Sequence, residues 1–169
     1  MDIWLRGDAA NIADFLMHQR IDVTKVSPAA YQAVAALQSY VDKSGLDPKL
    51  RELIKIRASQ INGCAYCLAM HTRDARKLGK TDEPMHLLNA WREASVYTTR
   101  ERAALGWIEA VTFVAQGHVP DEVFEAVRQE FSEKEIVDLT AAAIAINSWN
   151  RIAIAFRVPP QVESRKAAA

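Results

Sequence analysis

Helix start signals recur along this chain, and they restrict its fold more than any other feature. Ser27–Pro28 and Asp47–Pro48 each place a capping side chain before a proline. Proline is favourable at the first helical position, because an N–H there would have no hydrogen-bond partner within the helix and its absence costs nothing. Thr98–Glu101 and Ser132–Glu135 each read as a capping box. Alternating strand patterns with hairpin turns do not occur, so the chain is predicted to be all-α.

Together with the apolar periodicity, these signals predict a bundle of about six to eight helices. Helices are expected at residues 28–43, 48–61, 64–78, 83–92, 98–115, 120–130 and 133–156. A chain of 169 residues suits one domain, so residues 1–169 are assigned to a single helical domain. Its core is expected at 27–159, with an N-terminal extension at 1–20 and a short polar tail at 160–169.

Charge and hydropathy exclude several classes of function. Lys and Arg total 21 and Asp and Glu total 21, and five like charges never occur in a row, so no nucleic-acid partner is expected. The chain has no uncharged window of about 18 residues, so no membrane span is expected. The first residues lack the basic stretch and apolar core of a secretory signal, so the cytoplasm is the expected compartment.

The two cysteines of the chain, Cys64 and Cys67, stand three residues apart. In a reducing compartment such a pair is more often catalytic or metal-binding than structural. A helix that begins at Cys64 would hold both thiols in its first turn, where free N–H groups and the helix dipole stabilise an anion. Thiols in this position have pKa values of roughly 3.5–7.5, against roughly 8.5 for a free cysteine. The same spacing lets the two sulfurs form a disulfide.

An imidazole and a carboxylate accompany the cysteines. His71 follows Cys67 by one helical turn, so it is within reach to accept or donate a proton. Glu52 lies twelve residues before Cys64, on the preceding predicted helix. Whether its side chain faces the thiols depends on how the two helices pack.

The pattern E-x11-C-x2-C-x3-H, made by Glu52, Cys64, Cys67 and His71, resembles the core motif of AhpD-like alkylhydroperoxidases. These enzymes belong to the carboxymuconolactone decarboxylase superfamily, whose decarboxylases lack this cysteine pair.

The resemblance extends beyond the motif. The segments 98–105 and 147–153 are similar to the second helical segment and the closing helix of many members, so the likeness covers residues 27–159. It implies an AhpD-like helical fold that assembles into a homotrimer or homohexamer. The Ala- and Ile-rich segment 139–155, apolar almost all round, fits such an assembly.

The resemblance also implies a reaction. Cys67 would attack the terminal oxygen of a hydroperoxide and become a sulfenic acid, and Cys64 would resolve it to a Cys64–Cys67 disulfide. Glu52 and His71 would form a proton relay to Cys67 through water. An external dithiol, carried by a lipoyl-bearing or thioredoxin-like protein, would reduce the disulfide. No cofactor and no metal are implied.

One residue departs from the family pattern, and one role that the family implies disagrees with the expected acidity of the thiols. Tyr66 stands where well-studied members carry a histidine, and a phenol that titrates near 10 cannot act as a base at pH 7. The helix dipole favours Cys64 as the more acidic thiol, whereas the resemblance assigns the attack to Cys67. His86, on the short predicted helix after the motif, is a further candidate for lining the site.

Other interpretations of these residues remain open. The cysteines could be inert core residues, or bind zinc together with the imidazole and the carboxylate. The same pair could serve a general thiol–disulfide oxidoreductase, or a non-enzymatic protein whose disulfide changes its assembly. Trp91, Trp107 and Trp149 are interpreted as core or subunit-packing residues, and Asn150 and Arg151 as parts of a buried hydrogen-bond network.

Overall fold

The structure is a computed structural model, and it describes residues 18–162. Residues 1–17 and 163–169, which contain most of the expected N-terminal extension and polar tail, lie outside the described residues. The described part is helical throughout and contains no strand, which confirms the all-α prediction. Its helices are α2 (Val23–Val26), α3 (Pro28–Lys43), α4 (Pro48–Asn62), α5 (Ala65–Lys77), α6 (Asp82–His86), the 3-10 helix η2 (Leu87–Ala90), α7 (Thr99–Thr112), α8 (Val114–Gly117), α9 (Asp121–Glu130) and α10 (Glu133–Phe156).

Most helix boundaries agree with the sequence signals, and both predicted capping boxes are present. The hydroxyl of Thr98 accepts from the N–H of Glu101, and the hydroxyl of Ser132 accepts from the N–H of Glu135. In each box the glutamate carboxylate accepts in return from the backbone N–H of the capping residue. The proline at the start of α3 and of α4 lies in the first helical turn, as predicted. The single turn α2, capped by Asp22, was not predicted.

Two predicted helices are divided, so their single-helix predictions were wrong. The segment 83–92 changes from α6 to 3-10 geometry at Leu87, and in a 3-10 helix residues three apart share a face. Leu88 of η2 and Trp91, which directly follows it, are both buried. The segment 98–115 breaks at Phe113, within a run of β-branched and aromatic residues that lose side-chain freedom in a helix.

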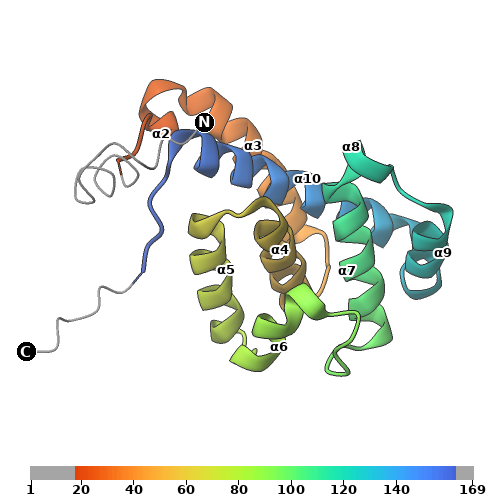
Figure 1. Cartoon of the computed structure of the whole chain (residues 1–169). Helices are drawn as coiled ribbons and strands as arrows, with labels where there is room; N and C mark the ends of the chain where they lie inside the picture. Colours follow the sequence, from red (N-terminus) through yellow and green to blue (C-terminus); the bar gives the residue numbers. More distant parts are fainter. Residues whose placement is uncertain (1–17, 163–169) are drawn as a thin grey trace, which may run out of the picture.

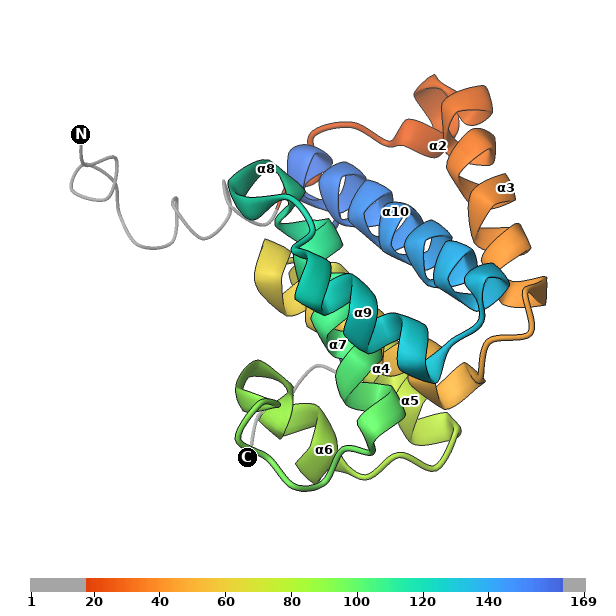
Figure 2. The ribbon, with the colours of Figure 1, turned by 90° about the vertical axis from the view of Figure 1, so that its right-hand side faces the viewer.

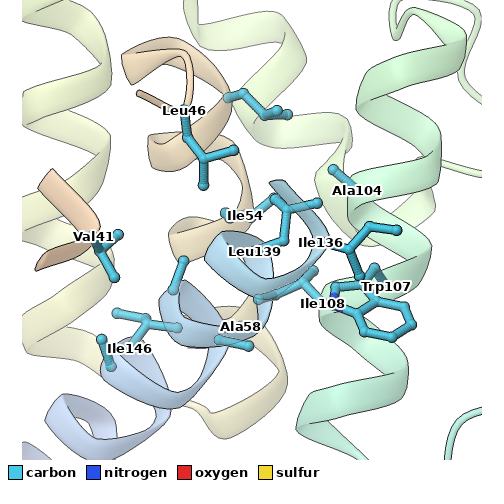
Figure 3. Close-up of a cluster of buried hydrophobic side chains, with 14 of the residues drawn as sticks. Val41, Leu46, Ile54, Ala58, Ala104, Trp107, Ile108, Ile136, Leu139 and Ile146 are labelled. Atoms are coloured by element: carbon cyan, nitrogen blue, oxygen red, sulfur yellow. The ribbon is translucent and has the colours of Figure 1, made fainter. Parts of the chain in front are cut away.

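Helix α10 is the central element of the packing. It contacts α3, α4, α5, α7 and α9, and Figure 2 shows it running between α3 on one side and α7 and α9 on the other. The main core forms where α10 meets α4 and α7. Figure 3 shows the apolar side chains that meet there, among them Leu139 and Ile146 of α10 with Ile54 and Ala58 of α4.

Helix α4 is buried in two apolar clusters. Ile54 belongs to the main core, whereas Leu53 belongs to a second cluster formed with α6, η2 and α7. Both side chains are fully buried, and each such burial contributes about 1.5–3 kcal/mol. The remaining face of α4 carries three buried polar residues, Glu52, Lys55 and Ser59. Because apolar packing in both clusters fixes the helix, these polar groups are held in place.

Buried polar contacts connect α10 to its neighbours. Asn150, with no exposed surface, donates to the hydroxyl of Ser59 at 3.1 Å and accepts from Asn62 at 2.9 Å. The predicted buried network is therefore confirmed for Asn150. It was wrong for Arg151, which is exposed and bonds within its own helix to Asn147.

The segment before α2 returns to the end of α10. The N–H of Arg20 donates to the carbonyl of Phe156 at 2.8 Å, and its guanidinium donates to the carbonyl of Ala155. Figure 1 shows this end of the molecule, with α2 and the start of α3 beside the last turns of α10. None of the described helices has the length and apolar character that crossing a bilayer requires.

Candidate active site

The junction between α4 and α5 positions the cysteines. Gly63 has a left-handed φ of 68°, a conformation that costs a residue without a Cβ little. Its N–H donates to the carbonyl of Gln60 at 3.2 Å, and the N–H of Cys64 donates to the carbonyl of Ser59 at 3.0 Å. This pair of bonds is a Schellman motif, and it closes α4 sharply at the predicted break. The chain reverses there, so α5 lies alongside α4 (Figure 1).

Cys64 caps α5, whereas the sequence had suggested that it forms the first helical residue. Its carbonyl accepts from the N–H of Leu68 at 3.0 Å, while Cys67 lies in the first turn. Both are free thiols, and each is about 1% exposed. The helix N-terminus and the thiol pair therefore coincide, which is the arrangement that stabilises a thiolate.

The two thiols differ in acidity. The pKa of Cys64 is lowered to about 7, mainly because the Cys67 thiol donates a hydrogen bond to its sulfur. Burial opposes this lowering. Further hydrogen bonds add to it, from the backbone N–H groups of Cys67 and Tyr66 and from the side-chain amide of Asn150. The pKa of Cys67 is raised, because its proton is held on the Cys64 sulfur and because it is buried beside that charge. Of the two thiols, Cys64 is therefore the more acidic.

Glu52 and His71 form a buried pair across the two helices. The Glu52 carboxylate lies 2.7 Å from Nδ1 of His71, and its other oxygen accepts from Nζ of Lys55 at 3.0 Å. Burial alone would raise the pKa of Glu52, but the hydrogen bond and charge of His71, and then those of Lys55, hold it below its ordinary value. The carboxylate therefore stays charged and orients the imidazole.

A cavity of about 590 Å³ brings most of the predicted site residues together. Its lining includes Cys67, His71, Glu52 and Tyr66. An aromatic pair from other helices, Tyr31 of α3 and Trp149 of α10, also lines it, with ring centroids 5.0 Å apart. Volumes of roughly 300–1,000 Å³ are typical of small-molecule sites.

The structure places His86 elsewhere. This exposed residue lines a different cavity, together with Arg57, Arg76 and other residues of α4, α5 and η2. Sequence reasoning had left it as a possible neighbour of the thiols.

Four residues of the site were missed by sequence reasoning. Lys55 had a signal, since a lysine three residues after Glu52 interrupts the apolar stripe of α4. Tyr31 and Trp149 had no such signal in the sequence, because their place in the cavity depends on how α3 and α10 pack in the folded chain. Trp149 had been interpreted as a packing residue. Asn150 was expected in a buried network but not as a hydrogen-bonding partner of both thiols.

Potential metal ligands also gather near the site. Among the described residues, Glu52, His71 and Asp74 present ligand atoms within 4.8 Å of one another. The two cysteines are not part of this group, so the alternative of a zinc site with two thiolates is not assembled among the described residues. The ammonium of Lys55 already occupies one oxygen of Glu52 and opposes a further cation there.

Comparison with known proteins places these residues in a family. Residues 28–110 match the model of the carboxymuconolactone decarboxylase family, a segment that includes the whole cysteine motif. The uncharacterized protein YdfG of Bacillus subtilis is 42% identical over 139 residues, which are 82% of this chain and 95% of that protein.

Solved structures share the fold. A protein of unknown function from Agrobacterium tumefaciens, which its description relates to the antioxidant defence protein AhpD, is 49% identical with a TM-score of 0.84, over 86% of this chain and all of that one. A peroxidase-related protein from Silicibacter sp. is 26% identical with a TM-score of 0.68, over 78% and 70% of the two chains. The debrominase Bmp8 has the same fold at 22% identity, with a TM-score of 0.67, over 81% and 73%. With these relatives, the chain belongs to the carboxymuconolactone decarboxylase family, among its AhpD-like members.

Proposed function

We propose that this protein is an enzyme that reduces hydroperoxides through a Cys64–Cys67 dithiol and disulfide. One observation carries the proposal: Cys67 shares a cavity with the Glu52–His71 pair and is hydrogen-bonded to an acidic second thiol. The cavity thus combines a sulfur that can be oxidised, a partner that can resolve it and a proton carrier. The peroxidase-related and AhpD-like names of relatives agree with it.

The groups present can complete the reaction. The Cys67 sulfur attacks the terminal oxygen of the hydroperoxide, and its proton passes to the Cys64 thiolate. The O–O bond breaks, and His71 donates a proton to the departing alkoxide to give an alcohol. Cys64 then returns its proton to His71, and its sulfur attacks the Cys67 sulfenic acid. Hydroxide leaves, takes that proton and becomes water, and the disulfide remains.

This sequence assigns different tasks to the two thiols. A low pKa suits Cys64 as the resolving nucleophile, because the thiolate is the attacking form. It makes Cys64 a weak base, so the Cys67 proton reaches it because the two thiols are hydrogen-bonded and not because Cys64 is basic. Cys67 is the sulfur that lines the cavity with His71, where the departing alkoxide needs its proton. Acidity therefore favours Cys64 and position favours Cys67, and the sulfenic-acid labelling described below decides between them.

The cavity favours an organic hydroperoxide without charge. At about 590 Å³ it is much larger than hydrogen peroxide, which is little larger than a water molecule of roughly 30 Å³. Tyr31, Tyr66 and Trp149 offer apolar ring surface. The ammonium of Lys55, which lines the cavity, is already paired with Glu52, and the carboxylates of Asp22, Asp42 and Asp74 are paired with other cations, so nothing in this charge pattern favours an anionic substrate. An external dithiol in the reducing cytoplasm would complete the cycle.

A second candidate function is the removal of halogen from an aromatic ring. Bmp8, a debrominase with this fold, is also known as a cysteine-to-alanine variant in complex with 2,3,4-tribromopyrrole. The Tyr31–Trp149 pair beside Cys67 is the observation that favours an aromatic substrate here. Bromide release from a bromopyrrole, measured in the same preparation as hydroperoxide consumption, distinguishes the two activities.

We also propose that the chain forms a homotrimer or homohexamer. Val137 and Ile144 stand two helical turns apart on α10 and are 61% and 50% exposed. Sedimentation velocity at micromolar concentration should therefore give an oligomer, and Ile144→Glu should shift it towards the monomer. Val26→Glu, which changes an exposed residue of α2, should leave the oligomer intact. A wild-type monomer would contradict the proposal.

Steady-state turnover tests the reaction directly. With cumene hydroperoxide and dihydrolipoamide, the wild type should consume many equivalents per subunit, and both Cys64→Ser and Cys67→Ser should stop at one or fewer. A sulfenic-acid probe should label Cys64→Ser, in which Cys67 cannot be resolved, and should not label Cys67→Ser.

The opposite labelling pattern would make Cys64 the attacked thiol. Consumption that ends at one equivalent in the wild type would instead favour a redox-responsive, non-enzymatic protein. Rapid insulin reduction without hydroperoxide turnover would favour a general thiol–disulfide oxidoreductase.

Glu52→Gln tests the proton relay. The amide keeps the shape of the side chain but cannot hold His71 and Lys55 by charge, so kcat/KM should fall about 100-fold or more. Glu101→Gln is the matched control, since it changes a glutamate of α7 that lies outside the cavity and forms a comparable 2.7 Å ion pair with Lys80. Normal turnover of folded Glu52→Gln protein would rule out the relay.

The acidity of Cys64 can be measured by the ultraviolet absorbance of its thiolate. As pH rises, the reduced wild type should gain one thiolate with a midpoint near pH 7. Cys64→Ala should lose this step. In Cys67→Ala the midpoint should rise towards about 8.5, because the main hydrogen bond to the thiolate is gone. A low-pH step that persists in Cys64→Ala would assign the acidic thiol to Cys67.

A further inference from the structure

The two cysteines line different cavities. Cys67 lines the cavity of about 590 Å³ that also contains Glu52 and His71, and Cys64 is absent from its lining. Cys64 lines a second cavity, of about 280 Å³, between the start of α5 and the residues at and after the end of α10. Exposed residues of this second cavity, among them Ala65 and Ile154, connect it to the surface.

A thin wall separates the two cavities. Tyr66, Ala153 and Val158 line both of them, so these side chains stand between the two spaces. The disulfide that the proposed function requires would lie in this wall. One sulfur would then face each side.

The two cavities differ in charge. The lining of the larger one includes four carboxylates, those of Asp22, Asp42, Glu52 and Asp74. Each is paired with a lysine or arginine, of which only Lys55 lines the cavity itself. Among the described residues that line the smaller one, none is acidic and Arg157 is basic. Binding of a neutral hydroperoxide depends little on the charges that line a cavity. A thiolate, which is the attacking form of a reducing dithiol, meets four carboxylates in the lining of the first cavity and none among the described residues that line the second.

We propose that the external dithiol enters the smaller cavity and attacks Cys64, so that oxidant and reductant reach the disulfide from opposite sides. The inference rests on the proposed function in requiring that the Cys64–Cys67 disulfide be cycled. It identifies the smaller cavity as a second binding site, for the thiolate arm of a dithiol. Apolar residues beside Cys64, among them Ile154, Pro159 and Pro160, would contact the carbon chain of that arm.

The exchange is balanced. The thiolate of the dithiol forms a bond to the Cys64 sulfur, the Cys64–Cys67 bond breaks, and its electron pair goes to Cys67. His71, one turn along α5 in the same cavity as Cys67, is placed to protonate that thiolate. The second thiol of the reductant then attacks its own mixed disulfide and releases Cys64. The dithiol leaves as a disulfide, and the two cysteines are reduced.

Acidity and the charge of the cavity lining act in opposite directions in this step. A more acidic thiol leaves faster, which by itself favours attack on Cys67 with Cys64 as the leaving group. The lack of carboxylates in the lining beside Cys64 favours attack on Cys64, whereas burial does not distinguish the two cysteines, because each is about 1% exposed. The site of the mixed disulfide is therefore a direct measure of which effect dominates.

Mapping the mixed disulfide in the wild type is the first test. The disulfide is formed with diamide, so the result does not depend on any reaction with hydroperoxide. Brief exposure to 2-mercaptoethanol and quenching with N-ethylmaleimide should place the mercaptoethanol on Cys64 and the maleimide on Cys67. The reverse placement would overturn the proposal.

Blocking each cavity separately is the second test. Ile154→Trp should slow reduction of the diamide-formed disulfide by dithiothreitol at least tenfold and leave oxidation by cumene hydroperoxide within twofold of wild type. Val23→Trp, in the larger cavity, should slow oxidation and leave reduction unchanged. Val96→Trp, which changes a half-exposed loop residue lining neither cavity, should alter neither rate.

These half-reactions separate the two proposals. Reduction of Ile154→Trp at the wild-type rate, or slowed reduction in Val23→Trp, would refute entry through the smaller cavity. Failure of hydroperoxide to oxidise the wild type would refute the proposed function alone, because the reduction experiments start from the diamide-formed disulfide.

Discussion

The left-handed turn at Gly63 is the constraint on which the rest of the site depends. It ends α4 with a Schellman motif and reverses the chain within two residues, so that α5 returns along α4. The same reversal makes Cys64 the cap of α5 and places His71 opposite Glu52, 19 residues earlier in the chain. A residue with a Cβ at position 63 would adopt this φ only with strain, which would disturb the thiol pair and the relay together.

The polar face of α4 is the second requirement, and it has an energetic cost. Glu52, Lys55 and Ser59 are all buried, and a buried charge is tolerated only when it is paired and hydrogen-bonded. The structure meets this condition with partners from three helices: His71 from α5, Lys55 within α4, and Asn150 from α10 bonded to Ser59. The two apolar clusters that include residues of α4 supply the stability that offsets the cost. Buried charge of this kind, kept beside a thiol pair, is typical of a site that moves protons.

The sequence was informative wherever the determining interactions are local. Prolines in the first turn and two capping boxes defined the starts of four helices, because each acts within a few residues. It failed where distant contacts decide, as at η2, where Leu88 and, directly after the helix, Trp91 are both buried. The motif residues were found by their spacing along one helix and its predecessor. Tyr31, Trp149 and Asn150 could not be found that way, because α3 and α10 approach α5 only in the folded chain.

The central claim is that Cys64 and Cys67 act as one redox unit in the native fold. Intact and peptide mass spectrometry after one equivalent of cumene hydroperoxide tests it most directly. The account predicts the loss of two hydrogens, a peptide pair joined through Cys64 and Cys67, and no cysteine left to alkylate. Two unlinked, unoxidised thiols that alkylate as slowly as free cysteine would contradict it.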